Sequence, residues 1–291
     1  MAIWAFNFLV VKFGLRYLPA LTFAAYRVVA AGLFMLAIAP ICSRLPFFSL
    51  SRPESQITGH DLWTFFYLGF FGVAVNQLCF TIGLSHTNVM HSSIIVGLAP
   101  IYTLTLAVVF GLERLTLRIV MGMTIAFTGV ALLASSTGMA RRSPTLFGDA
   151  ITMCGSLGFA VYVVLGKRVA GQYNPLTMTT WNFIFGALIT LPLAVHQFLA
   201  NDSVHTWRAL PWQAYACVFY TGLLSSTLAY LFYFWLLRYL EASQLASFSY
   251  LLPASASALS ILFLGERGSL LELVGAILAL FGVYSIESTR R

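Results

Sequence analysis

Ten long runs of apolar residues dominate this chain, and short polar connections separate most of them. The runs are about 18 to 25 residues long, which is the length that a helix needs to cross roughly 30 Å of hydrocarbon. Only 9% of the residues are charged, far fewer than in a water-soluble domain. The sequence therefore predicts an all-α integral membrane protein. Its ten expected spans are residues 2–17, 20–42, 62–84, 89–112, 117–136, 147–166, 175–199, 211–237, 242–265 and 269–286.

A constant separation of 153 residues aligns much of the first half of the chain with the second half, without a gap. The matched residues include Pro100 with Pro253, Glu113 with Glu266, Gly122 with Gly275, and Gly129 with Gly282. Prolines, glycines and an acidic residue in one register indicate a duplication. Because each unit holds five spans, the second unit must enter the membrane in the opposite sense. We expect two inverted five-helix repeats, residues 1–136 and 147–287, joined by a linker at residues 137–146.

Several short motifs in this order resemble the drug/metabolite transporter superfamily, specifically its EamA-type members with ten helices. They are Trp4-Ala5-Phe6-Asn7-Phe8 in the first span, Arg27 with small apolar residues after it, and the end of each repeat, from Pro100 to Arg114 and from Pro253 to Arg267. The resemblance implies export or exchange of small metabolites, often amino acids or toxic compounds, and the expected inverted repeat favours a secondary transporter with alternating access. The resemblance further implies a cavity between helices one to four and six to nine, with helices five and ten at the periphery.

Arg27 is the most informative single residue, because it lies about 10 Å into its span, where an unpaired charge is expensive. One interpretation places its guanidinium on a cavity wall, where it attracts a carboxylate. The other has the side chain reach the membrane interface or bind backbone carbonyls. Lys12 poses the same choice, and there a snorkelling anchor is favoured. Phe183 stands near the expected repeat partner of Arg27, so the halves differ in chemistry.

Other polar and aromatic side chains within the spans are candidates for the cavity lining. Bonds between helices and belts at the membrane interface are the competing interpretations. The polar candidates are Asn7, Asn76, Gln77, His91, Asn182 and Gln244. The aromatic candidates are Trp4, Tyr102, Tyr162, Trp181, Tyr230 and Tyr250.

Four residues are candidates for structural or gating roles. Pro100 and Pro253 interrupt their helices and are either hinges or inert kinks. Glu113 and Glu266 precede helices five and ten, where a carboxylate can cap exposed N–H groups. Capping is the favoured interpretation, and gating is the alternative.

The remaining expectations concern partners, location and chemistry. No metal site, cofactor or nucleic-acid partner is expected, because His86 and His91 are spaced unsuitably for one helical face and the basic residues are scattered. The expected partners are a small-molecule substrate and the lipid bilayer, with the protein a monomer or a weak homodimer. The distribution of basic residues modestly favours cytoplasmic termini, and we expect a multi-pass protein of the inner (plasma) membrane. A membrane-embedded enzyme acting on a lipid-linked substrate is the alternative function, although no catalytic constellation supports it.

Overall fold

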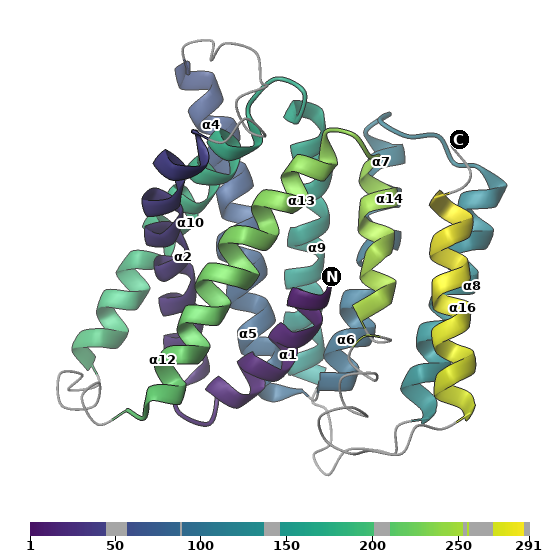
Figure 1. Ribbon diagram of the computed structural model, residues 1–291, viewed down its shortest axis with the longest axis horizontal. Coiled ribbons are helices and arrows are strands. Elements are labelled where there is room, and N and C mark those ends of the chain that lie inside the picture. Colours follow the sequence, from purple (N-terminus) through teal and green to yellow (C-terminus); the bar gives the residue numbers. More distant parts are fainter. Residues whose placement is uncertain are drawn as a thin grey trace.

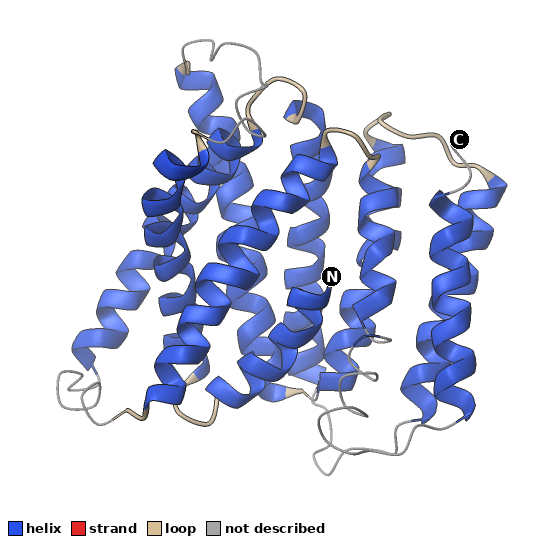
Figure 2. Cartoon of the chain, in the orientation of Figure 1, coloured by secondary structure: helices blue, strands red, loops and turns tan. Residues whose placement is uncertain are grey.

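The computed structural model describes residues 1–44, 57–87, 89–136, 146–200, 210–252, 255 and 270–287. Within these ranges the chain is helical, with short turns and no strand (Figure 2). Most helices run roughly parallel or antiparallel to one another, as in a bundle that crosses a bilayer (Figure 1). Among the described residues, five continuous helical stretches are long and apolar enough to span a membrane: Ala20–Cys42, Gly59–His86, Leu146–Val169, Pro175–Leu199 and Trp212–Leu237.

The described residues of the first half form five helical segments, some of them divided. Its third segment changes from α-helix to π-helix and back, and its fourth is broken between α6 and α7. The elements are α1 (Ala2–Gly14), α2 (Ala20–Cys42), α4 (Gly59–Leu68), the π-helix η1 (Gly69–Val75), α5 (Asn76–His86), α6 (Val89–Gly97), α7 (Ala99–Val109) and α8 (Leu117–Ser136).

The second half repeats this order, including a π-helix in its third segment. The elements are α9 (Leu146–Val169), α10 (Pro175–Ala200), α12 (Trp212–Phe219), the π-helix η2 (Tyr220–Leu228), α13 (Ala229–Leu237), α14 (Ala242–Ser247), the 3-10 helix η3 (Phe248–Tyr250) and α16 (Leu270–Glu287). The two π-helices end at Val75 and Leu228, which are 153 residues apart. An uncommon distortion therefore recurs at equivalent positions of the two halves.

The separation is 155 residues for the first two segments of each half, because α2 begins at Ala20 and α10 begins at Pro175. We call two residues related by these separations counterparts. In this register the counterpart of Arg27 is Asn182, not its neighbour Phe183 as the sequence suggested. The change of register falls in the connection that follows the second segment, where the two halves differ in length.

Helices α8 and α16 pack side by side at one edge of the bundle (Figure 1). A Cβ atom placed on Gly129 would lie 2.5 Å from the carbonyl oxygen of Gly275, and one on Gly282 would lie 2.6 Å from that of Gly122. A shift of 153 residues turns one contact into the other, because Gly129 corresponds to Gly282 and Gly122 corresponds to Gly275. Such reciprocity is the property of a twofold interface, and small residues allow the backbones to approach this closely.

Two lysines, one in each half, cap the C-terminal end of a helix in the same way. Nζ of Lys12 in α1 donates to the carbonyl oxygens of Leu84, at 2.8 Å, and Thr87, at 2.9 Å, beyond the last turn of α5. Its counterpart Lys167 in α9 donates to the two counterpart carbonyls at the end of α13. They belong to Leu237, at 3.1 Å, and Leu240, at 2.7 Å. Lys12 therefore binds helix-end carbonyls inside the protein rather than acting as a free interface anchor.

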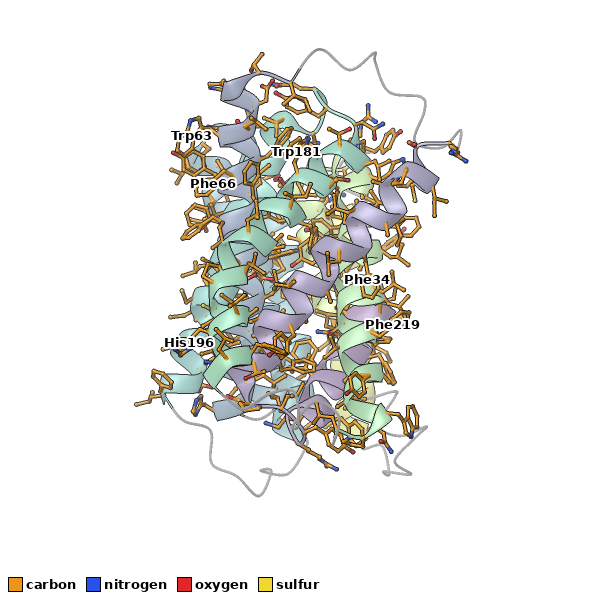
Figure 3. All side chains as sticks on the ribbon, turned by 90° about the vertical axis from the view of Figure 1, so that its left-hand side faces the viewer. Phe34, Trp63, Phe66, Trp181, His196 and Phe219 are labelled. Atoms are coloured by element: carbon orange, nitrogen blue, oxygen red, sulfur yellow. The ribbon has the colours of Figure 1, made fainter. Side chains whose placement is uncertain are left out.

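The outer surface carries large apolar side chains, as a surface in contact with lipid does. Trp63 is 61% exposed and Phe219 is 52% exposed. Phe219 packs edge-on against Phe34 at 5.4 Å between ring centroids, on the face that Figure 3 turns toward the viewer. The aromatic core, in contrast, lies where α9 and α13 meet.

Candidate functional site

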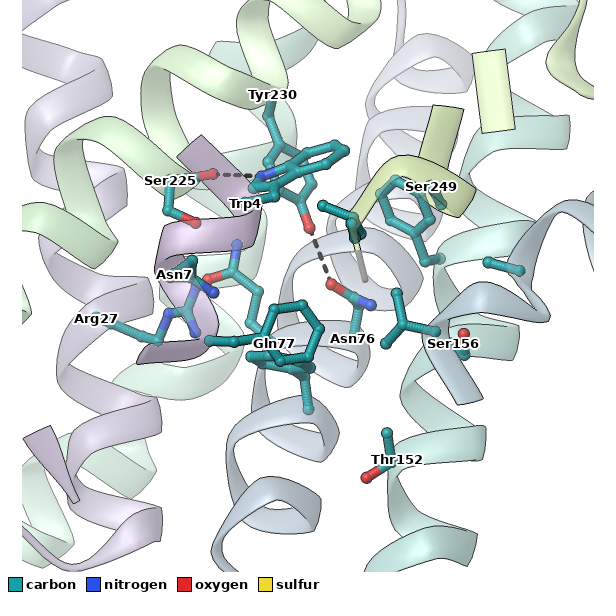
Figure 4. Close-up of a pocket in the computed structure, with 16 residues that line it drawn as sticks. Trp4, Asn7, Arg27, Asn76, Gln77, Thr152, Ser156, Ser225, Tyr230 and Ser249 are labelled. Carbon is teal, nitrogen blue, oxygen red and sulfur yellow. Dashed lines mark hydrogen bonds between the residues drawn. The ribbon is translucent and has the colours of Figure 1, made fainter. Parts of the chain in front are cut away.

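A cavity lies at the centre of the bundle, and both halves of the chain contribute to its wall (Figure 4). Helices α1, α2, α5, α6 and α7 supply one side, and α9, η2, α13 and η3 supply the other. The lining residues are Trp4, Asn7, Phe8, Arg27, Asn76, Gln77, Phe80, Val96, Ala99, Thr152, Ser156, Phe159, Ser225, Tyr230, Ser249 and Leu252.

Arg27 brings a positive charge to this cavity from the second turn of α2. Its side chain is 3% exposed, and its guanidinium donates to the hydroxyls of Thr81, at 3.3 Å, and Ser226, at 3.5 Å. Both bonds are long, and Nε has no partner. Among the described residues, no carboxylate lines the cavity to balance this charge. The geometry thus favours the cavity-wall interpretation of Arg27 over snorkelling.

Two neutral polar side chains beside Arg27 also have unused hydrogen-bonding capacity. Gln77 accepts from the Ser226 hydroxyl through Oε1 at 2.9 Å, but its Nε2 has no partner. Oδ1 of Asn7 is likewise buried without a partner. Buried polar atoms are almost always satisfied by protein, water or ligand. Unpartnered atoms on the wall of a cavity are therefore expected to contact what fills it.

An aromatic wall faces these polar groups. The indole N–H of Trp4 donates to the carbonyl of Ser225 at 2.9 Å, and its ring lies 5.8 Å from that of Phe159 and 5.7 Å from that of Tyr230. The Tyr230 hydroxyl donates to Oδ1 of Asn76 at 2.9 Å, as Figure 4 shows. Hydrogen bonds at both rings fix this wall in position. The site can hold a small molecule with a carboxylate at one end and an apolar part at the other.

Comparison with known proteins identifies the fold that carries this site. A model of the EamA-like transporter family matches residues 1–135 and 146–287. The chain belongs to the EamA-like transporter family. This family has a ten-helix membrane fold.

Named relatives of this EamA-like protein match it along almost its whole length. An uncharacterized transporter of Archaeoglobus fulgidus is 26% identical over 287 residues, which cover 99% of this chain and 95% of the relative. A protein of Streptantibioticus cattleyicolor named as a probable terminal-alkyne amino-acid exporter is also 26% identical, over 98% of this chain and 93% of its own. A solved crystal structure superposes with a TM-score of 0.70 at 15% identity, covering 98% of this chain and 93% of the other. That likeness shows the fold alone.

Six of the residues expected in the cavity lie on its wall, while six others lie elsewhere. Those on the wall are Trp4, Asn7, Arg27, Asn76, Gln77 and Tyr230. The side chain of the remaining candidate, His91 in α6, lies outside the described part of the structure.

Four of the six residues that lie elsewhere are placed away from the cavity. Trp181 stacks on Phe65 between α10 and α4, and Tyr102 is half-buried on α7 outside the lining. Tyr250 packs with the small residues of α8 and α16. Oε1 of Gln244 accepts from the Glu241 backbone N–H at 3.2 Å and caps the start of α14.

The other two, Tyr162 and Asn182, are fully buried beside the cavity. Helix α10, which was expected to line the cavity, supplies no described lining residue and packs on α2 instead.

The gating and capping candidates are placed in part. Glu113 was expected to cap α8, the helix that follows it. Its carboxylate instead accepts from the backbone N–H of Ser243, at 3.0 Å, and from the Ser243 hydroxyl, so it caps the distant helix α14. Pro100 sits in the first turn of α7, after the break at Leu98. Pro253 and Glu266 lie outside the described residues.

Several lining residues were not predicted from the sequence, because serine, threonine and phenylalanine are common in any membrane helix. Some of the lining residues are counterparts of one another. Phe159 is the counterpart of Trp4, Ser249 of Val96, and Leu252 of Ala99, and every one of these lines the cavity. Among the described residues, no group of three or more His, Cys, Asp or Glu side chains could hold a metal ion.

Proposed function

We propose that this protein is a secondary transporter that exports or exchanges small metabolites, amino acids among them. The observation that carries the proposal is Arg27, a cation with spare hydrogen-bonding capacity in a central cavity to which both halves contribute. A substrate carboxylate would pair with the guanidinium of Arg27. Such an ion pair is strong where water is scarce. An ammonium group could be received by Oδ1 of Asn7 and by the aromatic faces of Trp4 and Tyr230. The relative named as a probable amino-acid exporter supports this substrate class.

The proposed mechanism is alternating access between two inverted repeats, residues 1–136 and 147–287, joined by the linker 137–146. The reciprocal glycine contacts of α8 with α16 and the paired lysines support a twofold relation between the halves. In such a carrier the site lies near the middle of the bilayer, and the halves rock around it. The contact between α2 and α10, which are counterpart helices, lies where such a rocking axis would pass.

Flux into liposomes tests the proposal directly. The purified protein, reconstituted without ATP, should accelerate uptake or counterflow of at least one labelled amino acid from a panel that covers acidic, basic, aromatic and aliphatic side chains. Arg27→Met is the matched control, because it keeps the length of the side chain and removes the charge. Absence of flux over the whole panel by correctly folded protein would refute the amino-acid proposal.

The same vesicles test energy coupling. We expect facilitated diffusion or exchange, because neither of the described acidic residues Glu113 and Glu241 stands in the cavity lining. An imposed pH gradient should then leave the initial rate unchanged for a zwitterionic amino acid. A rate that follows the gradient would instead establish proton coupling.

Location and assembly complete the proposal. We place the protein in the inner (plasma) membrane with cytoplasmic termini. We expect a monomer or a weak homodimer, because one chain already encloses the cavity. Tagged termini in intact and permeabilised cells test the orientation. A mass measurement of the detergent-solubilised protein tests the assembly.

A further inference from the structure

Three buried residues of the second half occupy the positions that correspond to three lining residues of the first half. We call Tyr162, Asn182 and Tyr233 the closed cluster. They lie on α9, α10 and α13. The counterpart pairs are Arg27 with Asn182, Asn7 with Tyr162, and Phe80 with Tyr233.

The closed cluster contains polar atoms that nothing in the described structure satisfies. Tyr162 and Asn182 are 0% exposed and Tyr233 is 4% exposed. The two tyrosine hydroxyls and both amide atoms of Asn182 lack hydrogen-bond partners. The Asn182 amide lies near the Tyr162 hydroxyl but forms no hydrogen bond with it. Several unpaired polar groups at one buried place require an explanation, because burial without a partner is unfavourable.

A single aromatic wall separates the closed cluster from the cavity. The Tyr230 ring lies 5.8 Å from that of Tyr162, and the Tyr233 ring lies 5.4 Å from those of Trp4 and Phe159. Along α9, Tyr162 follows the lining residue Phe159 by about one turn. The closed cluster therefore continues the line of the cavity toward the end of the bundle where α9 and α13 finish (Figure 1).

We propose that the closed cluster is the second half of the substrate path, and that it opens to the other membrane surface when the aromatic wall parts. In that state the Asn182 amide and the two tyrosine hydroxyls would bind the carboxylate-bearing substrate through neutral hydrogen bonds. This inference rests on the proposed transport function. In a second state of the protein, the substrate would be the hydrogen-bond partner of the unpaired groups. In an inverted-repeat carrier, each half takes up in one state the arrangement that the other half has in the other state, so counterpart positions would face the substrate in turn.

Sided labelling of single cysteines tests the inference. The four native cysteines, Cys42, Cys79, Cys154 and Cys217, are first replaced by serine. Asn182→Cys and Tyr162→Cys then report on the closed cluster, and Ser225→Cys reports on the cavity. Val164→Cys is the matched control, because Val164 is also 0% exposed on α9 and is packed in the hydrophobic core. A charged, membrane-impermeant maleimide is added to either surface of membrane vesicles of known orientation.

The labelling rate of each cysteine should depend on the membrane surface to which the maleimide is added. Asn182→Cys and Tyr162→Cys should react from the surface where α13 ends, at least about ten times faster than Val164→Cys, since covalent labelling traps a minor state populated at about 0.1–10%. Ser225→Cys should react from the opposite surface. Reaction of both cluster cysteines at the rate of Val164→Cys, in protein that still transports, overturns the inference and leaves the proposed function standing. Sided reaction in protein that moves no amino acid supports an opening cluster and refutes the amino-acid proposal.

Discussion

Three lining residues of the cavity and the three residues of the closed cluster occupy equivalent positions in the two halves, yet only the cavity is open. The counterpart of Arg27 is Asn182 in the closed cluster, and the counterpart of the lining residue Ser225 is Gly72, which lies against the cluster residue Tyr162. The Tyr162 ring lies directly over Gly72, and a Cβ atom there would come within 2.1 Å of it. Neutral aromatic groups can close over a glycine at little electrostatic cost, whereas a guanidinium needs water or a partner. The comparison indicates that the two halves share a backbone arrangement, although the side chains at equivalent positions differ in charge and polarity.

The strongest test of the comparison is removal of its one charge. Arg27→Met should reduce substrate affinity in the cavity about 10- to 100-fold, because a hydrogen bond to a charged group contributes about 1.5–3 kcal/mol. Thermal stability should stay the same or rise, since a buried guanidinium with an unpartnered Nε is lost. Binding and thermal unfolding in detergent measure the two effects. Arg27→Lys should retain part of the affinity, and full affinity of Arg27→Met would remove Arg27 from the site.

Gly72 can be used to disturb the closed cluster alone. Gly72→Ala should destabilise the protein by about 1–3 kcal/mol, because the new methyl group overlaps the Tyr162 ring. The displaced ring should also raise the labelling rate of Asn182→Cys. Ser225→Ala is the control at the counterpart position, where a Cβ atom is already present, and its effect on unfolding should be small. Equal stability of the two variants would show that Tyr162 closes without the help of this glycine.

The two lysines test how far the halves are equivalent. Lys12→Met and Lys167→Met should each lower the free energy of unfolding by about 1–2 kcal/mol, because each lysine donates two charge-assisted bonds to carbonyls in a partly buried setting. The double variant should be additive to within about 0.5 kcal/mol, since the sites share no partner. Thermal unfolding of all three variants measures this. A large effect at only one lysine would limit the symmetry to the backbone.

The smallest effect is expected at a contact that has no counterpart in the other half. The Tyr173 hydroxyl donates to the Asp61 carboxylate and joins the α9–α10 turn to the start of α4. Tyr173→Phe should cost only about 0.5 kcal/mol, because the hydrogen bond to Asp61 is only partly buried. Such a loss would leave the cavity unchanged. A marked change of transport rate would instead identify this contact as a gate on that side.

The pH dependence of this contact follows from the pKa of Tyr173. Burial, followed by the hydrogen bond to Asp61, raises that pKa to about 12, whereas an unfolded tyrosine ionises near 10. Because the folded value is the higher one, the contribution is complete below about pH 10 and is lost as the pH rises through about 12. The stability difference between wild type and Tyr173→Phe should therefore be constant from about pH 6 to 9 and shrink above about pH 10.

The helices were readable from local sequence, but much of the site was not. The expected start of the second span coincides with that of α2, and Arg27 stands out because charge is rare inside a span. Glu113 shows the limit. Its position before α8 suggested a local cap, but it caps α14, which lies 130 residues further along the chain. Nothing in the local sequence around Glu113 indicates that partner.

The sequence by itself determined that this chain crosses a membrane as helices, because apolar length and backbone hydrogen bonding leave few alternatives in lipid. It also predicted a duplication, since proline, glycine and charged residues recur at one separation, but not the 155-residue separation of the first two segments. Only the tertiary structure decided which face of each helix meets the cavity, because a residue's direction depends on how its helix is rotated and packed. Tyr230 therefore lines the cavity while Tyr162 lies closed behind it, although both are tyrosines in the middle of apolar helices.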